Sequence, residues 1–464
     1  MKTKLNFFSQ LLIVAITLMI FQNANAQDWK PLFNGKDFSG WEKKNGDAEY
    51  HVSDGAIVGT SKTGTPNTFL CTQEKYGDFI LELEVMVAPG LNSGIQFRSN
   101  SFKTYQDGRV HGYQSELDTS IRAWTGGIYD EGRRGWLYPL TINDKGSAAF
   151  QNSQWNKVRI EAIGSSIKTF INGIQCANLV DDMTANGFIA LQVHSIRDQS
   201  QEGKTIQWKN IRILTQNLDQ HKSPSQPNAK LISYLDNTLT QEELRKGWRL
   251  LWDGKTSDGW RGARMDSFPN QGISLENGTI HFLNHKENNS KNSGDIVTED
   301  QFSDFELEVD FMLSEGGNSG IKYFVDALTE GDGRNIGFEY QVLHKNHPDA
   351  TQGVDGNRTI GSLYDLITAE NLSSKNSNDN RFRSKGPGQW NRARIIVKGG
   401  HVEHWLNYIK VVEYDRFSQS MKNLIKKSKY NNHKGFGVGE MGKILLQDHS
   451  PGDIKFKNVK IREL

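Results

Sequence analysis

The chain of 464 residues contains only two cysteines, Cys71 and Cys176. Two cysteines cannot form the dense disulfide framework on which small secreted domains depend, so hydrophobic cores must hold this chain together. We expect both to be small buried hydrophobic residues, because cysteine is commonly used in that way. A single bridge between them is the alternative.

The chain also lacks an excess of charge of either sign. Its 55 Lys and Arg residues stand against 54 Asp and Glu residues, which gives a formal net charge of +1. Such a balance offers no long-range attraction for nucleic acid or for an anionic membrane surface, so neither is an expected partner. The basic run 422–429 (KNLIKKSK) has no counterpart in the first half of the chain, and we interpret it as a solvated insertion.

The chain has no apolar run long enough to span a bilayer. Its apolar run 11–21 is too short for that, and it lies between Lys2 and Lys4 on one side and Ala24-Asn25-Ala26 on the other. This is the pattern of a cleavable secretory signal covering residues 1–26. We therefore expect a periplasmic or secreted protein without a membrane span in the mature chain, and without the cysteine that a lipid anchor needs at the cleavage site.

The sequence contains two copies of one domain. Residues 32–41 (LFNGKDFSGW) return as residues 251–260 (LWDGKTSDGW), and residues 78–95 match residues 304–321. A period of roughly two hundred residues is far longer than any solenoid unit, so each copy is a whole domain. The expected organisation is a signal at 1–26, a first domain at 27–215, a linker with a short helix at 216–247, and a second domain at 248–464.

The segment between the copies is polar, contains proline and has no periodicity from Gln216 to Lys230, which is typical of a linker. Thr240 and Glu243 then have the spacing of a capping box, in which each side chain bonds the other's backbone amide. This pattern predicts a short helix before the second domain.

Each copy is dominated by alternation of apolar and polar residues. Residues 80–87 and 305–311 alternate in this way, and turn signals such as Asn172-Gly173 separate further candidate strands. About ten short strands per copy without long helical patterns predict an all-β protein of two tandem jelly-roll β-sandwiches.

Several long strings in both copies resemble one bacterial family. They are GFEYQVL at 337–343, HPDA at 347–350, DGNR at 355–358 and GSLYD at 361–365 in the second copy, and residues 112–118 and 122–136 in the first. The family is the 3-keto-disaccharide hydrolase domain, formerly a domain of unknown function. The resemblance implies a concanavalin A-like lectin/glucanase sandwich. It also implies cleavage of glycosides whose sugar carries a ketone at carbon 3, with a separate sugar 3-oxidoreductase as functional partner.

One strand of the first copy carries a row of polar residues. Gln114, Glu116 and Asp118 alternate, so their side chains project from one face about 7 Å apart. Laminarinase-like glucanases of this fold present their nucleophile in such a Glu-x-Asp pair, but they add a second glutamate shortly afterwards, and here Thr119 follows. An ordinary retaining hydrolase is therefore disfavoured, and a strand with a merely solvated polar face is the alternative.

The neighbouring residues of the first copy supply hydrogen-bond donors and aromatic rings suited to a sugar. The Asn-Ser-Gly-Ile motif is followed by Gln96 in the first copy and by Lys322 in the second, and Lys322 and Arg98 are candidate donors to an oxygen that gains charge. The candidate substrate-binding residues of this copy are Gln96, Arg98, Gln114, Arg122, Trp124, Tyr129 and Arg133.

In the second copy Glu339 and Gln341 share one strand face. His194 and His449 each follow a glutamine by two residues and are candidate proton shuttles, or else residues of the shared fold kept since duplication. The candidate catalytic residues of the chain are Glu116, Asp118, His194, Lys322, Glu339 and His449. The candidate substrate-binding residues of the second copy are Gln341, Arg358, Tyr364 and Asp365.

No cofactor motif is evident. His344, His347 and Asp349 could ligate a divalent cation, but their spacing is irregular and Pro348 suggests a turn with surface histidines. Asn-Ser-Gly-Ile, identical at 92–95 and 318–321, is expected to place its glycine where the backbone is approached closely.

A ketone at carbon 3 acidifies the hydrogen on carbon 2, so a single base can start loss of the aglycone from carbon 1 by elimination. Hydration of the product completes a net hydrolysis. This is the expected reaction, and it explains how a sandwich without the usual glutamate pair could cleave a glycoside. A noncatalytic tandem carbohydrate-binding module is the alternative, because a sandwich with aromatic platforms also serves that purpose.

Overall fold

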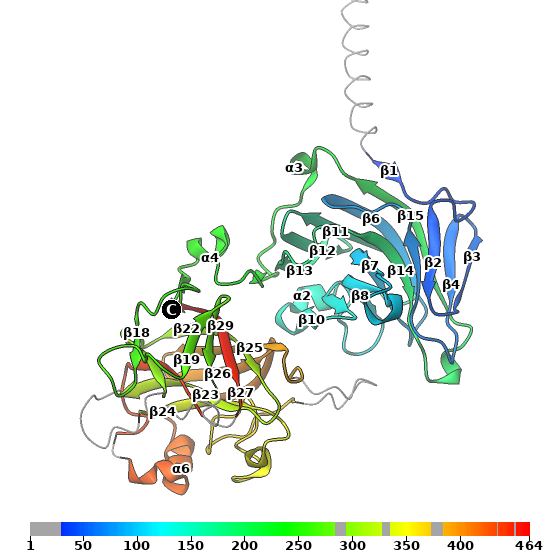
Figure 1. The fold of residues 1–464 in the computed structure, drawn as a ribbon. Helices are drawn as coiled ribbons and strands as arrows, with labels where there is room; N and C mark the ends of the chain where they lie inside the picture. Colours follow the sequence, from blue (N-terminus) through cyan, green and yellow to red (C-terminus); the bar gives the residue numbers. More distant parts are fainter. Residues whose placement is uncertain (1–28, 284–293, 327–334, 373–383, 434, 450–451) are drawn as a thin grey trace, which may run out of the picture. The chain divides into compact units, whose positions relative to one another are not determined.

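The structure is a computed structural model that describes residues 29–464 except 284–293, 327–334, 373–383, 434 and 450–451. The predicted signal at 1–26 lies outside the described residues. The chain forms two compact units, Met1–Tyr234 and Leu235–Leu464, called here the first and the second unit. Each is a sandwich of two sheets (Figure 1).

The first unit has an outer sheet and a site sheet, named for the candidate site described below. The outer sheet runs in the order β16 (Ile232–Ser233), β13 (Ile174–Val180), β12 (Ser166–Ile171), β11 (Asn156–Ile163), β6 (Phe79–Val87), β15 (Thr205–Leu214), β4 (Ala56–Thr60) and β3 (Glu49–Ser53), with β1 (Lys30–Pro31) beside β15. The site sheet runs in the order β10 (Gly135–Tyr138), β9 (Ile128–Glu131), β8 (His111–Asp118), β7 (Asn92–Asn100), β14 (Phe188–Val193), β5 (Thr68–Thr72) and β2 (Trp41–Asn45).

The second unit repeats this order. Its outer sheet runs β19 (Ile273–Glu276), β20 (Thr279–Phe282), β29 (Ile454–Glu463), β22 (Phe305–Leu313), β25 (Trp390–Lys398), β26 (His401–Leu406) and β27 (Ile409–Asp415), with β17 (Arg249–Leu250) beside β29. Its site sheet runs β18 (Trp260–Gly262), β21 (Ile296–Thr298), β28 (Lys443–Leu446), β23 (Asn318–Asp326) and β24 (Ile336–Leu343).

Helices are short in the part of the chain that the structure describes. The α-helices are α2 (Asp144–Ser147), α3 (Leu218–His221), α4 (Gln241–Arg245) and α6 (Gln419–Lys427). The 3-10 helices are η1 (Gln106–Gly108), η2 (Leu140–Ile142), η3 (Gln199–Gln201), η4 (Pro348–Thr351) and η5 (Lys429–Asn432). No helix among these residues is long and apolar enough to cross a membrane. The prediction of an all-β protein built as two tandem sandwiches is confirmed.

Alternation explains why these segments are strands that pack on one another. In β6 the side chains of Leu81, Leu83, Val85 and Val87 are at most 3% exposed and face the core between the sheets. Cys71 and Cys176 are buried and unpaired, as expected of two small hydrophobic residues.

The second unit differs on the outward face of β22. Glu306, Glu308 and Asp310 alternate with the core residues but are buried as well. Arg392 and Arg394 of β25 form ion pairs with Asp310 and Glu306. The Lys460 ammonium lies 3.0 Å from Glu308 and 2.6 Å from Glu243 of α4, so it links the helix to β22. Thr240 and Glu243 form the predicted capping box at the start of α4, so this helix is fixed to the outer sheet by its own capping residue.

The segment expected to be a linker is bound to the first unit over most of its length. The Ser223 amide donates to Glu161 at 2.9 Å, the Gln226 amide donates to Gln175 at 2.6 Å, and β16 pairs with β13 in parallel. Asn237 instead bonds Asn458 of the second unit. The polar residues therefore pair with buried polar partners, and the change from one unit to the other falls at Tyr234 and Leu235.

Candidate functional site

A cavity of about 230 Å³ opens on the site sheet of the second unit. Strands β23 and β24 and the end of β28 form its floor, and the segments around Tyr364 and η5 form its wall. The lining residues are Asn318, Lys322, Asn335, Ile336, Gly337, Glu339, Gln341, Tyr364, Lys429, Tyr430, His433, Gln447 and His449. It therefore brings together five of the residues singled out from the sequence, namely Lys322, Glu339, Gln341, Tyr364 and His449.

The strand register sets three of these residues in a row. Lys322 of β23 lies directly opposite Glu339 of β24, and the Tyr364 amide donates to the Glu339 carbonyl at 3.0 Å from the other side. Directly paired residues have Cβ atoms about 5 Å apart on the same sheet face. A cation, a carboxylate and a phenol are thus side by side in the order Lys322, Glu339, Tyr364.

The glycine of the Asn-Ser-Gly-Ile motif makes room for the carboxylate. A Cβ atom added at Gly320 would lie 2.4 Å from Oε1 of Glu339. The same position in the first unit, Gly94, makes room for Gln114, whose Cδ would lie 2.2 Å from an added Cβ. The close approach at this motif is therefore made by the side chain diagonally across the strand pair, because Gly320 pairs directly with Gln341 and Gly94 with Glu116.

Glu339 is held in an environment that favours its protonated form. Its side chain is 5% exposed, and no hydrogen bond to its carboxylate comes from the residues that the structure describes. Burial raises the pKa of Glu339 above its ordinary value, and this outweighs the ammonium groups of Lys322 and Lys429, which favour the carboxylate. A carboxyl of raised pKa in a cavity is suited to accept and return a proton.

Two buried amide oxygens along the cavity have no hydrogen-bond partner among the described residues. They are Oε1 of Gln341, whose Nε2 donates to Asn318 at 3.1 Å, and Oδ1 of Asn335. Buried acceptors are costly when unpaired, so these two atoms are suited to receive the hydroxyl groups of a ligand. His449 lies at the outer end of this floor, paired with Asn318 across an isolated bridge, and is exposed.

The wall comes from an insertion that the first unit does not have. Ser418 caps α6, Met421 of α6 is buried, and Ser428 then caps η5, which begins with Lys429. The Lys429 amide donates to Asp365 at 3.2 Å, and its ammonium lies 4.1 Å from the centroid of the Tyr364 ring. The basic run is an exposed insertion, as predicted, since Lys422, Lys426, Lys427 and Lys429 are all exposed. The structure adds that α6 packs on the core and brings Lys429 to the wall of the cavity.

Arg358 and Asp365 support this wall. Nη2 of Arg358 donates to Oδ1 of Asp365 at 2.8 Å, and the guanidinium lies 5.4 Å from the centroid of the Tyr364 ring. Both residues were expected to bind substrate. The structure places them behind Tyr364 and Lys429, where they fix the positions of these two side chains.

In the first unit amides occupy the equivalent row. Gln96 lies opposite Gln114 and donates to it at 2.6 Å, Gln192 donates to the same oxygen at 3.0 Å, and Tyr129 follows on β9. All three glutamines are at most 2% exposed. The residues that correspond to Lys322 and Glu339 are therefore uncharged and bonded to each other.

The carboxylates of the first unit are paired with an arginine. Arg122 donates to Glu116 at 3.1 Å and to Asp118 at 2.7 Å, and its guanidinium lies 4.9 Å and 5.0 Å from ring centroids of Trp124 and Trp136. Burial raises the pKa of Glu116, while Arg122 opposes the rise. The sequence correctly groups these side chains on one face, but the structure shows them bonded to one another.

Several other expected site residues lie elsewhere. The prediction that Arg98 binds substrate is wrong. Its guanidinium donates to Gly77, to Asp78 and to Gly164 in the turn between β11 and β12. A β-bulge, in which Arg98 has a φ of 45°, turns the side chain toward the other sheet. Arg133 donates to Asp130 at 2.7 Å, and Nδ1 of His194 is 2.7 Å from the Ser195 carbonyl.

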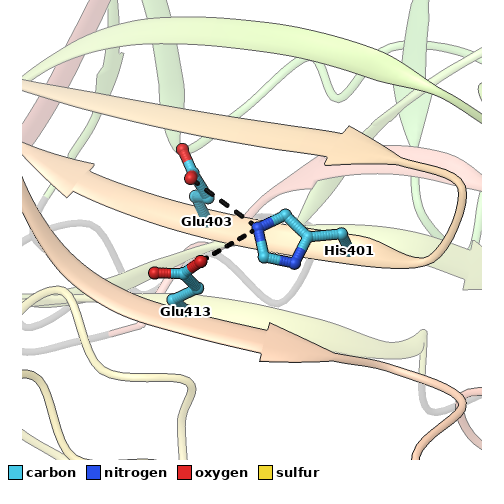
Figure 2. Close-up of side chains that lie close together, drawn as sticks. All are labelled: His401, Glu403 and Glu413. Carbon is cyan, nitrogen blue, oxygen red and sulfur yellow. Dashed lines mark ion pairs between the residues drawn. The ribbon is translucent and has the colours of Figure 1, made fainter.

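The candidate metal ligands do not converge on one point. Nδ1 of His347 accepts the Asp349 amide at 3.1 Å, and Nδ1 of His344 accepts the Gly316 amide at 3.3 Å. Among the described residues a different group, His401, Glu403 and Glu413, has ligand atoms within 4.8 Å of one another (Figure 2). It is on the outer sheet, away from the cavity, and Lys410 pairs with both of its carboxylates.

Comparison with known proteins gives related sequences for both copies. The family described as the 3-keto-alpha-glucoside-1,2-lyase-like domain matches residues 28–214 and 247–462. A Bacteroides thetaiotaomicron protein named 3-keto-disaccharide hydrolase is 35% identical over 240 residues, which are 47% of this chain and 79% of that protein.

Solved structures similar to this chain include two bacterial proteins. A candidate glycosyl hydrolase from Parabacteroides distasonis is 30% identical with a TM-score of 0.40, over 50% of this chain and 100% of that one. A carbohydrate-binding module from Bacillus subtilis is 16% identical with a TM-score of 0.28, over 38% of this chain and 95% of that one.

Proposed function

We propose that this chain, which belongs to the 3-keto-alpha-glucoside-1,2-lyase-like domain family, cleaves 3-keto-glycosides in the cavity of its second unit. The observation that carries the proposal is the buried Glu339 directly opposite Lys322, in a cavity of about 230 Å³. This volume is below the roughly 300–1,000 Å³ typical of drug-sized ligands and suits one sugar ring. The unpartnered oxygens of Gln341 and Asn335 supply acceptors for its hydroxyl groups.

The order Lys322, Glu339, Tyr364 determines how the substrate lies in the proposed reaction. The ketone oxygen on carbon 3 lies at the Lys322 ammonium, and the hydrogen on the adjacent carbon 2 lies over the Glu339 carboxylate. Glu339 removes that proton, Lys322 stabilises the charge that moves onto the ketone oxygen, and the bond from carbon 1 to the aglycone breaks. Addition of water to the double bond between carbons 1 and 2 gives the 3-keto sugar.

The first unit has a different task, because Gln96 and Gln114 replace the cation and the base. The buried amides of this row supply no base, and Glu116 beside them is paired with Arg122. We assign to this unit no part in proton removal.

Two further parts of the proposal concern the setting of the reaction. The substrate must carry a ketone at carbon 3, and Lys322, Glu339 and Tyr364 cannot oxidise a hydroxyl group to a ketone. A separate sugar 3-oxidoreductase must therefore supply the oxidised sugar. Residues 1–26 have the composition of an export signal, and we propose that the protein works in the periplasm or outside the cell.

The test compares a glucoside with its 3-keto derivative, using aglycone release as the measurement. Release from the 3-keto compound only, with deuterium entering carbon 2 when the reaction is run in heavy water, is the expected result. Equal rates on the two compounds would contradict the elimination mechanism. Binding of the sugar without release would favour a tandem carbohydrate-binding module.

A further inference from the structure

The elimination needs an acid at the glycosidic oxygen, and the order of the row indicates where it must be. Carbon 3 lies at Lys322 and carbon 2 at Glu339, so carbon 1 and its leaving oxygen lie at the Tyr364 end of the row. Above Tyr364 is the ammonium of Lys429, 4.1 Å from the ring centroid. Two groups that carry a transferable proton therefore lie beside the leaving oxygen.

The surroundings of Lys429 leave its ammonium available. Asp365 is occupied by the Lys429 backbone amide and by Arg358, and no hydrogen bond or ion pair to Nζ comes from the described residues. Lys429 is exposed at the mouth of the cavity while its side chain lines the wall, so a proton given to the ligand can be replaced from solvent.

Acidity distinguishes Lys429 from Tyr364. Burial raises the pKa of Tyr364 above its ordinary value, which makes the phenol a poorer proton donor. Lys429 is exposed as a whole, but the part of its side chain that lines the cavity wall is partly desolvated, and this lowers the pKa of Lys429 more than the Glu339 and Asp365 carboxylates raise it. A general acid is most effective when its pKa is near the working pH, and of the two groups Lys429 is the one shifted in that direction.

We propose that Lys429 is the general acid that protonates the leaving glycosidic oxygen. This inference rests on the proposed elimination in the second unit. The proton on carbon 2 goes to Glu339, and its electron pair forms the double bond between carbons 1 and 2. The bond from carbon 1 to oxygen breaks, and a proton from Nζ goes to the departing oxygen.

Hydration reverses these transfers. The neutral Lys429 amine takes a proton from the water that attacks carbon 1, and protonated Glu339 returns its proton to carbon 2. Both groups end in their starting states, and the sum of the two stages is hydrolysis. The first unit has Gln96 and Gln114 at the positions of Lys322 and Glu339, and it also lacks the insertion that carries Lys429. The joint absence of all three groups fits groups that work together in one reaction.

The test uses two leaving groups of unlike acidity, the 4-nitrophenyl and the methyl 3-keto-glucosides. Lys429→Gln should lower kcat/KM on the methyl compound by about a hundred- to ten-thousand-fold. On the 4-nitrophenyl compound, whose anion leaves without a proton, the loss should be less than about tenfold, and deuterium exchange at carbon 2 should continue. Lys427→Gln, at an exposed position on α6, is the matched control and should match the wild type on both.

Lys429→Arg separates proton donation from charge. Arginine keeps the positive charge but does not give up a proton in proteins, so it should fail on the methyl compound as the glutamine variant does. Equal losses on both compounds, or full activity of the arginine variant, would overturn the assignment of the acid. A wild-type protein that neither exchanges carbon 2 nor releases either aglycone would overturn the proposed function itself, and this inference with it.

Discussion

Gly320→Ala should inactivate the second unit while leaving its fold nearly unchanged. The added Cβ would lie 2.4 Å from Oε1 of Glu339, whereas ordinary contact begins at 3.4 Å, so the carboxylate must move by about 1 Å. The displaced atom is the end of a flexible side chain, and the φ of Gly320 is not in the left-handed region, so the backbone can accept alanine. A misplacement of about 1 Å can cost on the order of a hundredfold in rate, or about 2.7 kcal/mol of transition-state stabilisation.

Gly94→Ala is the matched control, because it brings the same crowding to Gln114 in the first unit. Overpacking costs about 1–3 kcal/mol of the free energy of unfolding, and both variants should show losses of this size in thermal unfolding. Aglycone release from a 3-keto-glucoside should fall by about a hundredfold in Gly320→Ala only. Equal activity of Gly320→Ala and wild type, or an equal loss in Gly94→Ala, would refute the assignment of the base to Glu339.

The other expectations concern the two carboxylates, the boundary between the units and acid stability. Glu339→Gln should lower cleavage of the 3-keto substrate by about a hundred- to ten-thousand-fold, whereas Glu116→Gln should retain activity; the reverse result would move the reaction to the first unit. Dividing the chain between Tyr234 and Leu235 should give two soluble halves, of which only the second releases aglycone. Activity in the first half alone, or only when both halves are present, would contradict this expectation. Burial lowers the pKa of His404 from 6.5 to about 4, so between these pH values the unfolded second unit binds a proton that the folded unit does not. The free energy of unfolding of the second unit should therefore fall by about 3 kcal/mol as the pH drops from 6.5 to 4. A free energy of unfolding in urea that does not change over this pH range would contradict the expectation.

Part of the candidate site could be predicted from local pattern. Glu339 and Gln341 are two residues apart, and the period of a strand puts them on one face whatever the rest of the chain does. Lys322 follows from the repeated Asn-Ser-Gly-Ile string, which locates the neighbouring strand. Lys429 could not be found in this way, because its position depends on the packing of α6 and on the Asp365 contact.

The same limit explains the error at Arg98 and why the contacts of the linker could not be foreseen. Alternation places residue 98 on the face of Gln96, but a bulge changes the register after Phe97 and turns the side chain to the other sheet. Polarity predicts a linker at 216–230, and the structure adds that the Ser223 and Gln226 amides bond Glu161 and Gln175, two buried acceptors of the first unit. Polar composition does not show whether water or protein supplies the partner.

The sequence by itself determined the two copies, the all-β class and the residues on each strand face, because these depend on repetition and on a period of two. Only the tertiary structure decided which copy has a cavity beside a buried carboxyl on its site sheet. The two rows differ by the exchange of Gln96 and Gln114 for Lys322 and Glu339, and the sequence shows that exchange. Whether a carboxylate is paired with an arginine, as Glu116 is with Arg122, or lies beside a cavity, as Glu339 does, depends on how the surrounding segments fold, even when the partner is close in the chain. Electrostatic environment is a property of what surrounds a group in space, and local sequence does not contain it.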